Sequence, residues 1–192
     1  YKSGEMYSQQ RQNYTQQALS RLGVFKYNDF NYTPRPGRDT LDITVNAMFD
    51  LPYDSELELN VTTKSTKQTG PGAKFNLSKK NFKRMGASLN LELKGSYEWQ
   101  TSSTVDGDKS VMNSYELGAA LSLEFPRLVL PWIRNRVDPF RFPSETNFKI
   151  YAEQVNRARY FKMLSFGGTV SYSFQPKRSI KHTVTPIHLA FN

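Results

Sequence analysis

The sequence predicts a mainly β chain in which one short helical unit precedes a series of long antiparallel strands. Three observations indicate this. One window near the start has helical periodicity, whereas nearly everything after Pro52 alternates between apolar and polar residues. The alternating runs are also longer than the strands of about 5–6 residues that are usual in soluble proteins.

The helix is predicted from Ser8 to Leu22. Tyr14, Ala18 and Leu22 follow one another at i+4 spacing and therefore share one face. Ser8 is a suitable N-cap residue, and Gly23 is well placed to end the helix.

Two strands are predicted next, and a change of character follows them. An aromatic-rich strand runs from Val24 to Tyr32, and a turn with two prolines and a glycine separates it from a second strand. The second strand alternates and is expected to have one buried face, made of Leu41, Ile43, Val45 and Ala47. So small a unit is not expected to be stable alone, so we expect a further strand or helix before Tyr1. The domain boundary is placed at Pro52, which divides the chain into residues 1–51 and 52–192.

About seven alternating runs follow Pro52, and the longest extends from Ala87 to Gln100. Gly70-Pro71-Gly72 is interpreted as a hairpin turn between the first two runs. One face of the long runs is aliphatic with aromatic residues near its ends, and the other carries Glu, Lys, Asn and Ser. A tilted membrane strand needs about 9–11 residues, so the pattern favours a transmembrane β-barrel over a soluble antiparallel sandwich. The aromatic residues are Tyr97, Trp99, Tyr115 and Phe125.

Composition argues against several classes of function. The sequence has no cysteine, and its two histidines, His182 and His188, lie six residues apart on a predicted strand, which would place both on one face. No carboxylate cluster accompanies them, so we expect no metal site, no cofactor and no enzymatic activity. Alternation accounts for Glu56 and Glu58 without acid–base chemistry. The net charge of +9 suits an anionic partner, but the basic residues are scattered, so nucleic-acid binding is not expected.

Two segments carry a family pattern. Tyr14 to Tyr32 reads YTQQALSRLGVFKYNDFNY and is followed by LDITV at Leu41 to Val45. Gly70 to Tyr97 reads GPGAKFNLSKKNFKRMGASLNLELKGSY, with a turn at Asn81 to Gly86. In order and spacing the chain resembles the BamA/TamA superfamily of outer-membrane protein assembly factors (the bacterial surface antigen family), most closely its TamL-like branch.

The resemblance implies that residues 1–51 end the last POTRA domain and that residues 52–192 begin a transmembrane β-barrel, about seven strands of an implied sixteen. It implies a Gram-negative outer-membrane location, with the N-terminal part in the periplasm, and the assembly and insertion of other proteins. The implied partners are nascent outer-membrane proteins, the lipid bilayer or lipopolysaccharide, and periplasm-spanning or lipoprotein subunits. The family's Arg-Gly-Phe loop motif and closing β-signal are not found, so we expect a piece of a longer protein.

The candidate site is the edge of the first barrel strand, predicted from Ser55 to Lys64. A client strand could satisfy the N–H and C=O groups of this edge by β-augmentation. A passive outer-membrane pore or transporter barrel with a small periplasmic domain is the alternative, and a soluble β-rich adhesin or carbohydrate-binding domain is a third. The helix-strand-strand unit favours the assembly factor, because simple porins have none. The site residues are Ser55, Leu57, Leu59, Asn60, Val61, Thr62 and Thr63.

Strand parity predicts a topology if the N-terminal unit is periplasmic. The Lys67 to Pro71 turn and the Thr101 to Ser110 loop would be extracellular, and the Phe82 to Met85 and Pro176 to Ser179 turns and residues 126–143 periplasmic. Cysteine labelling at Asp106 and Lys177 would test this. In the longest run, we expect one set of residues to face lipid (Leu89, Leu91, Leu93 and Tyr97) and the other to face the lumen (Asn90, Glu92, Lys94 and Glu98).

Overall fold

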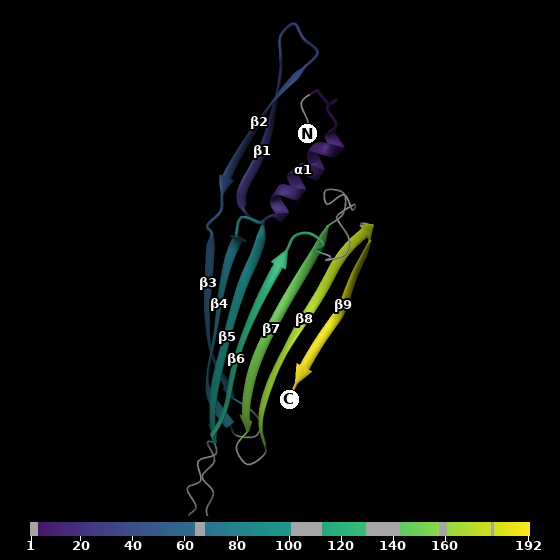
Figure 1. The fold of residues 1–192 in the computed structure, drawn as a ribbon. Helices are drawn as coiled ribbons and strands as arrows, with labels where there is room; N and C mark the ends of the chain where they lie inside the picture. The colour runs from purple at the N-terminus through teal and green to yellow at the C-terminus, as the bar shows by residue number, and fades with distance from the viewer. Residues whose placement is uncertain (1–3, 64–67, 101–112, 130–142, 158–160, 178) are drawn as a thin grey trace, which may run out of the picture.

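The computed structural model describes residues 4–63, 68–100, 113–129, 143–157, 161–177 and 179–192. In this part of the chain, one helix, α1 (Gln9–Arg21), precedes nine strands that form two antiparallel sheets. Figure 1 shows α1 and the two-stranded sheet at one end of the seven-stranded sheet. The expectation of a mainly β, antiparallel fold is confirmed.

The first unit consists of α1 and a hairpin of β1 (Phe25–Pro34) and β2 (Leu41–Phe49). Ser8 has extended backbone geometry, and its carbonyl accepts the first helical bond from the N–H of Gln12 at 3.0 Å. Gly23 follows the helix with a φ of +60°, a conformation that favours glycine. Both predicted helix ends are therefore confirmed.

The predicted burial of β2 is wrong, because every residue of that strand is exposed. Ile43 lies opposite Tyr32 of β1, and α1 packs over β1 rather than over β2. The ring of Tyr32 contacts the ring of Tyr7 at 5.0 Å between centroids, and Asn28 of β1 donates to Ser20 of α1. A single helix of this length covers one strand, so the apolar row of β2 is left uncovered in the described part of the chain.

The large sheet is a meander in which each strand pairs with the next in sequence. The seven runs predicted after Pro52 correspond to seven strands, each 11 to 17 residues long. β3 and β9 form the two edges and do not pair with each other, so the described sheet is open. The strands are β3 (Tyr53–Thr63), β4 (Gln68–Phe82), β5 (Ala87–Gln100), β6 (Asn113–Phe125), β7 (Ser144–Arg157), β8 (Phe161–Lys177) and β9 (Ile180–Phe191).

The registers align the alternating side chains into two faces. The polar face carries residues such as Glu58, Lys74, Lys94, Glu116 and Glu153. The apolar face is exposed over a wide area that spans several strands. Examples of exposed residues on it, with their exposed fractions, are Leu59 (73%), Val61 (74%), Leu117 (53%) and Ile150 (60%).

Gly70-Pro71-Gly72 is not a turn, as the sequence had suggested, but lies inside β4. Both glycines are buried, because neighbouring groups approach their Cα atoms closely. A Cβ on Gly70 would collide with the backbone of Tyr97 and Glu98 on β5. The predicted Lys67 to Pro71 turn is therefore wrong from residue 68 onward, because β4 begins at Gln68.

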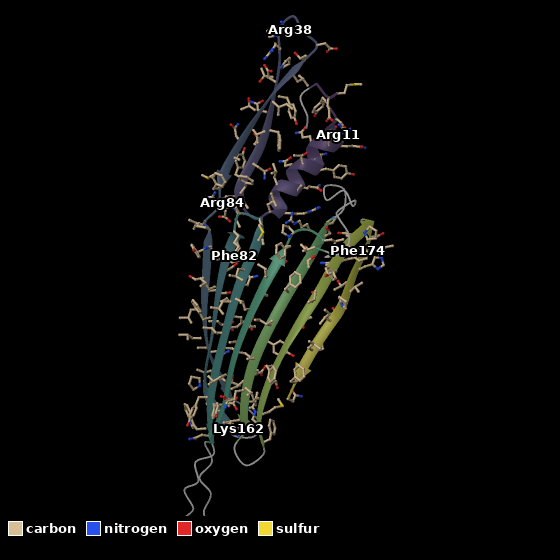
Figure 2. All side chains as sticks on the ribbon, in the orientation of Figure 1. Arg11, Arg38, Phe82, Arg84, Lys162 and Phe174 are labelled. Atoms are coloured by element: carbon tan, nitrogen blue, oxygen red, sulfur yellow. The ribbon has the colours of Figure 1, made fainter. Side chains whose placement is uncertain are left out.

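The end of the sheet nearest α1 carries three of the predicted connections. Turn geometry follows Phe82, with positive φ at Lys83 and Arg84, and Figure 2 shows Phe82 and Arg84 at this end. Leu22, just after α1, packs closely against Gly86, so a Cβ atom on Gly86 would lie only 2.9 Å from Cδ2 of Leu22. β6 and β8, which precede the other two predicted connections, end at the same end of the sheet (Figure 1). The expected Thr101 to Ser110 loop, including Asp106, lies outside the described residues.

Phe125, expected among exposed aromatic residues, is only 8% exposed. Its ring meets that of Phe148 edge-on at 6.1 Å between centroids. The segment after β6 folds back against β7, where the hydroxyl of Thr146 donates to the carbonyl of Arg127 and accepts from the N–H of Val129. Tyr97 and Trp99 remain exposed, as expected.

Candidate functional site at the first edge strand

β3 forms one edge of the large sheet, and each of its residues is exposed. It pairs with β4 from Tyr53, opposite Lys79, to Thr63, opposite Thr69, without a register shift. Among the described residues, no second strand pairs with it. The predicted first barrel strand is therefore an edge strand, although its last predicted residue, Lys64, lies outside the described part.

One hydrogen bond determines which backbone groups of β3 face the open side. The N–H of Lys80 donates to the carbonyl of Pro52, with 2.8 Å between N and O. In an antiparallel pair, hydrogen-bonded and non-hydrogen-bonded positions alternate. Because Pro52 and Lys80 form a hydrogen-bonded pair, the odd-numbered residues of β3 direct their N–H and C=O groups away from β4. These residues are Tyr53, Ser55, Leu57, Leu59, Val61 and Thr63.

Pro71 of β4 agrees with this assignment. It lies opposite Val61, at a non-hydrogen-bonded position of the β3–β4 pair, so its nitrogen is directed towards β5. A proline has no N–H to donate, and at this position it leaves the β3–β4 bonds intact. The missing donor would have bonded to β5. In the β4–β5 pair, no partner is assigned to Gly70 or Pro71, and pairing resumes at Gly72.

The structure divides the predicted site residues into two groups. Asn60 and Thr62 direct their backbone groups towards β4, where they lie opposite Gly72 and Gly70. Tyr53 belongs to the outward row but was not predicted, although it stands at the start of the same alternation. The predicted residues that direct their backbone groups to the open side are Ser55, Leu57, Leu59, Val61 and Thr63.

The other edge strand, β9, is less suited to accept a further strand. Its pairing with β8 shifts register between Val170 and Tyr172, and Pro186 lies within that shift. Bulges, prolines and lysines on an edge all hinder further pairing, and β9 also carries Lys181. β3 has no proline and no register shift. Of the two edges, β3 is therefore the better template.

Charged side chains on the polar face join three strands. The Nζ of Lys94 on β5 lies 2.9 Å from Oε1 of Glu116 on β6 and 3.2 Å from Oε1 of Glu153 on β7. Gly118 lies opposite Lys94 on β6, and a Cβ there would collide with the lysine stem. The absence of a side chain at Gly118 lets Lys94 extend across the middle strand.

Arg157 of β7 extends this network. Its Nη1 lies 3.0 Å from Oε2 of Glu98 on β5, and its Nη2 lies 3.7 Å from Oε2 of Glu116. Glu98 is only 5% exposed, so the guanidinium neutralises a carboxylate that is largely removed from water. Because the pairs cross three strands, they favour one register of β5, β6 and β7.

A hollow of about 320 Å³ lies beside the network, and Lys149, Tyr151 and Thr169 help to line it. Its lining mixes lysine and glutamate side chains, and no group of three or more potential metal ligands occurs among the described residues. The chemistry of the hollow does not point to one ligand. We therefore place the candidate site at the edge of β3.

The two histidines lie on opposite faces of the sheet, so their predicted placement on one face is wrong. His182 lies opposite Phe174, and its ring is 5.3 Å from the phenyl ring between centroids. His188 lies opposite Thr169, with 3.2 Å between Nδ1 and the threonine Oγ1. The register shift near Pro186 adds one residue to β9 and reverses the alternation between the two histidines.

Comparisons with family models, with curated proteins and with solved structures find no match. None of the helical segments in the described ranges is long and apolar enough to cross a membrane.

Proposed function

We propose that this chain is part of an outer-membrane protein assembly and insertion factor, in which the open edge of β3 templates the strands of client proteins. Residues 1–51 form the end of a POTRA domain that handles clients in the periplasm, and residues 52–192 form strands of a transmembrane β-barrel. The observation that carries the proposal is the row of outward-directed backbone groups on an exposed strand without bulges. The work of such a protein is strand pairing and needs no bond chemistry or cofactor.

The dimensions and surface of the large sheet support a membrane location. Strands of 11 to 17 residues reach or exceed the roughly 9–11 residues that a tilted strand needs to cross a bilayer. A continuous exposed apolar face is uncommon on soluble proteins and suits contact with lipid. The opposite face, with its network around Lys94, has the polar character of a barrel lumen.

Pairing with β3 would lower the free energy of a client strand that enters the membrane. Unsatisfied N–H and C=O groups in the hydrocarbon region cost several kcal/mol each, because no water is there to bond them. An edge with matching groups can satisfy them through the main chain, whatever the client's side chains are. Nascent outer-membrane proteins are the partners that need such a template, and bilayer lipids or lipopolysaccharide surround it.

The test replaces Val61 with proline, which removes one outward donor and leaves the β3–β4 hydrogen bonds in place. We expect Val61→Pro to lower the amount of client protein in the outer membrane, in cells that hold the variant at the same abundance as the unaltered protein. Thr62→Ser keeps every backbone donor and should support normal assembly.

Asn60→Pro is the comparison that separates pairing from folding. The N–H of Asn60 is directed to β4, so its loss should reduce the abundance of the protein itself. If Val61→Pro is stably inserted and supports assembly normally, the β3 edge is not the working surface. A passive pore or transporter barrel with a small periplasmic domain would then explain the chain better.

A further inference from the structure

The open edge of β3 carries three carboxylates in a row on its polar-face side. Asp54, Glu56 and Glu58 occupy successive polar-face positions, and all three are exposed. A strand that pairs with the outward backbone groups of β3 would place its own alternate side chains directly beside these carboxylates, with about 4.5–5.5 Å between Cβ atoms. The edge therefore presents a charge pattern together with its backbone groups.

Two of the carboxylates gain little charge compensation from β4. Lys74 lies opposite Glu58, but the nearest carboxylate to its Nζ is that of Glu92 on β5, at 3.9 Å. Glu56 accepts a hydrogen bond from the neutral amide of Asn76 at 3.3 Å. The one cation of β4 that lies opposite this row is thus directed to the next strand.

The third carboxylate, that of Asp54, also has no ion pair with a cation of β4 within 4.0 Å. Ser78 lies opposite Asp54 and donates instead to Oδ1 of Asn90 on β5, at 2.6 Å. Lys80 lies two positions beyond Ser78 on β4; its Nζ is bonded to Asp50 at 2.6 Å and also attracts the carboxylate of Asp54 without a direct contact. No described lysine, arginine or histidine has a nitrogen within 4.0 Å of any of the three carboxylates.

Elsewhere on the polar face, carboxylates are mostly paired with cations on other strands. Glu98, Glu116 and Glu153 each have such a partner, and so does Glu145, whose Oε2 lies 3.8 Å from Nζ of Lys181. In the described part of the chain, a row of three successive polar-face carboxylates without a cation nitrogen within 4.0 Å occurs on β3, one of the two edge strands. This distribution indicates that the counter-charges of the row come from whatever pairs with the open side of β3.

We propose that the β3 edge selects strands that carry lysine or arginine at alternate, polar-face positions, and that it disfavours strands with acidic residues there. This selection rests on the proposed function, because it acts on the strand that β-augmentation brings to the edge. Backbone bonds supply affinity for any strand, and the three carboxylates discriminate among strands. Opposite-charge pairs across strands stabilise and like-charge pairs destabilise, so three pairs produce about a tenfold preference.

The experiment uses the intact protein in neutral phosphatidylcholine vesicles and three fluorescent peptides of 11 residues, the length of β3. The peptides share one apolar face and carry lysine, glutamine or glutamate at three alternate positions on the other. We expect the lysine peptide to bind about tenfold more tightly than the glutamate peptide, with the glutamine peptide between them. The preference should shrink as ionic strength rises.

Three variants separate selection from pairing. The triple variant Asp54→Asn, Glu56→Gln, Glu58→Gln should bind all three peptides with similar affinity. Glu124→Gln removes a polar-face carboxylate of β6, away from the edge, and should keep the preference. Val61→Pro should weaken the binding of all three peptides to the same extent.

The outcomes distinguish the two proposals. Equal affinity of the unaltered protein for the lysine and glutamate peptides, together with weaker binding by Val61→Pro, would overturn the selection and leave templating intact. A preference that survives in the triple variant would also overturn the selection. Failure of all three peptides to bind would overturn templating and the selection with it.

Discussion

The ammonium group of Lys94 on β5 lies 3.2 Å from a carboxylate oxygen of Glu153 on β7, although a complete strand separates the two residues. Gly118 on β6 makes this contact feasible, because it has no side chain between them. The contact couples strands that are not hydrogen-bonded to each other. The polar face therefore stabilises the register of three strands at once.

Lys94→Met should lower the free energy of unfolding by about 1 kcal/mol. Partly exposed ion pairs contribute about 0.2–1 kcal/mol each, and Lys94 has two carboxylate partners. Denaturant unfolding in detergent micelles measures the change. Lys74→Met is the control, because its single partner is 3.9 Å away, and its effect should be smaller. Equal losses from both variants would contradict a special role for Lys94.

Leu91→Arg should be far more damaging than Glu92→Arg. Leu91 belongs to the apolar face, opposite Leu77 and Leu121, whereas Glu92 belongs to the polar face. If the apolar face contacts lipid near the bilayer midplane, arginine there should cost about 2–4 kcal/mol, and arginine on a lumen face much less. Refolding into lipid vesicles measures the difference. Equal tolerance of the two substitutions would favour a soluble sheet.

Gly70→Ala should destabilise the sheet by about 1–3 kcal/mol, because the added methyl group meets immobile backbone atoms of β5. Gly168→Ala is the matched control. At Gly168 the nearest atoms to a new Cβ are 3.7 and 3.8 Å away, which is ordinary contact. The unfolding midpoint of each variant in denaturant measures the loss of stability. An unchanged midpoint for Gly70→Ala would show that β4 and β5 can separate at this point.

The ion pair between Asp50 and Lys80 should make stability depend on pH in the acid range. The hydrogen bond from Lys80, followed by one from the N–H of Leu51, holds the pKa of Asp50 below its ordinary value of 3.8. A carboxylate with a lowered pKa stabilises the fold above its ordinary pKa, and this contribution is lost as the pH falls through the lowered value. Asp50→Asn should therefore lower the unfolding midpoint at neutral pH, and the difference from the unaltered protein should vanish in strong acid. A difference that persists in acid would show that charge is not its cause.

Local periodicity determined much of this fold. The alternation from Ala87 to Gln100 predicted β5 with the ends that the structure has, and the N-cap and final glycine of α1 were predicted from residue type and spacing. The change of character at Pro52 matches the passage from the small sheet to the large one. Each of these features depends on residues close together in the sequence, which is why they could be predicted.

The edge position of β3 was predicted from a family resemblance, but its working groups could not be. Alternation reveals the face on which the side chain of Asn60 or Val61 lies. It does not reveal which lateral side the N–H of each residue faces, because that depends on the pairing with β4. The hydrogen bond between Lys80 and Pro52 shows which side each N–H faces, and these two residues are 28 positions apart in the sequence.

The predictions that the structure contradicts share one physical origin. The sequence by itself determined which segments are strands and which residues alternate. Only the tertiary structure decided that Gly70 and Gly72 serve the close approach of neighbouring groups rather than a turn, and that a bulge near Pro186 places His182 and His188 on opposite faces. The uncovered apolar row of β2 is a further case, because burial depends on where α1 packs. Register, bulges and coverage arise from contacts between distant segments, and the period of a single strand does not record them.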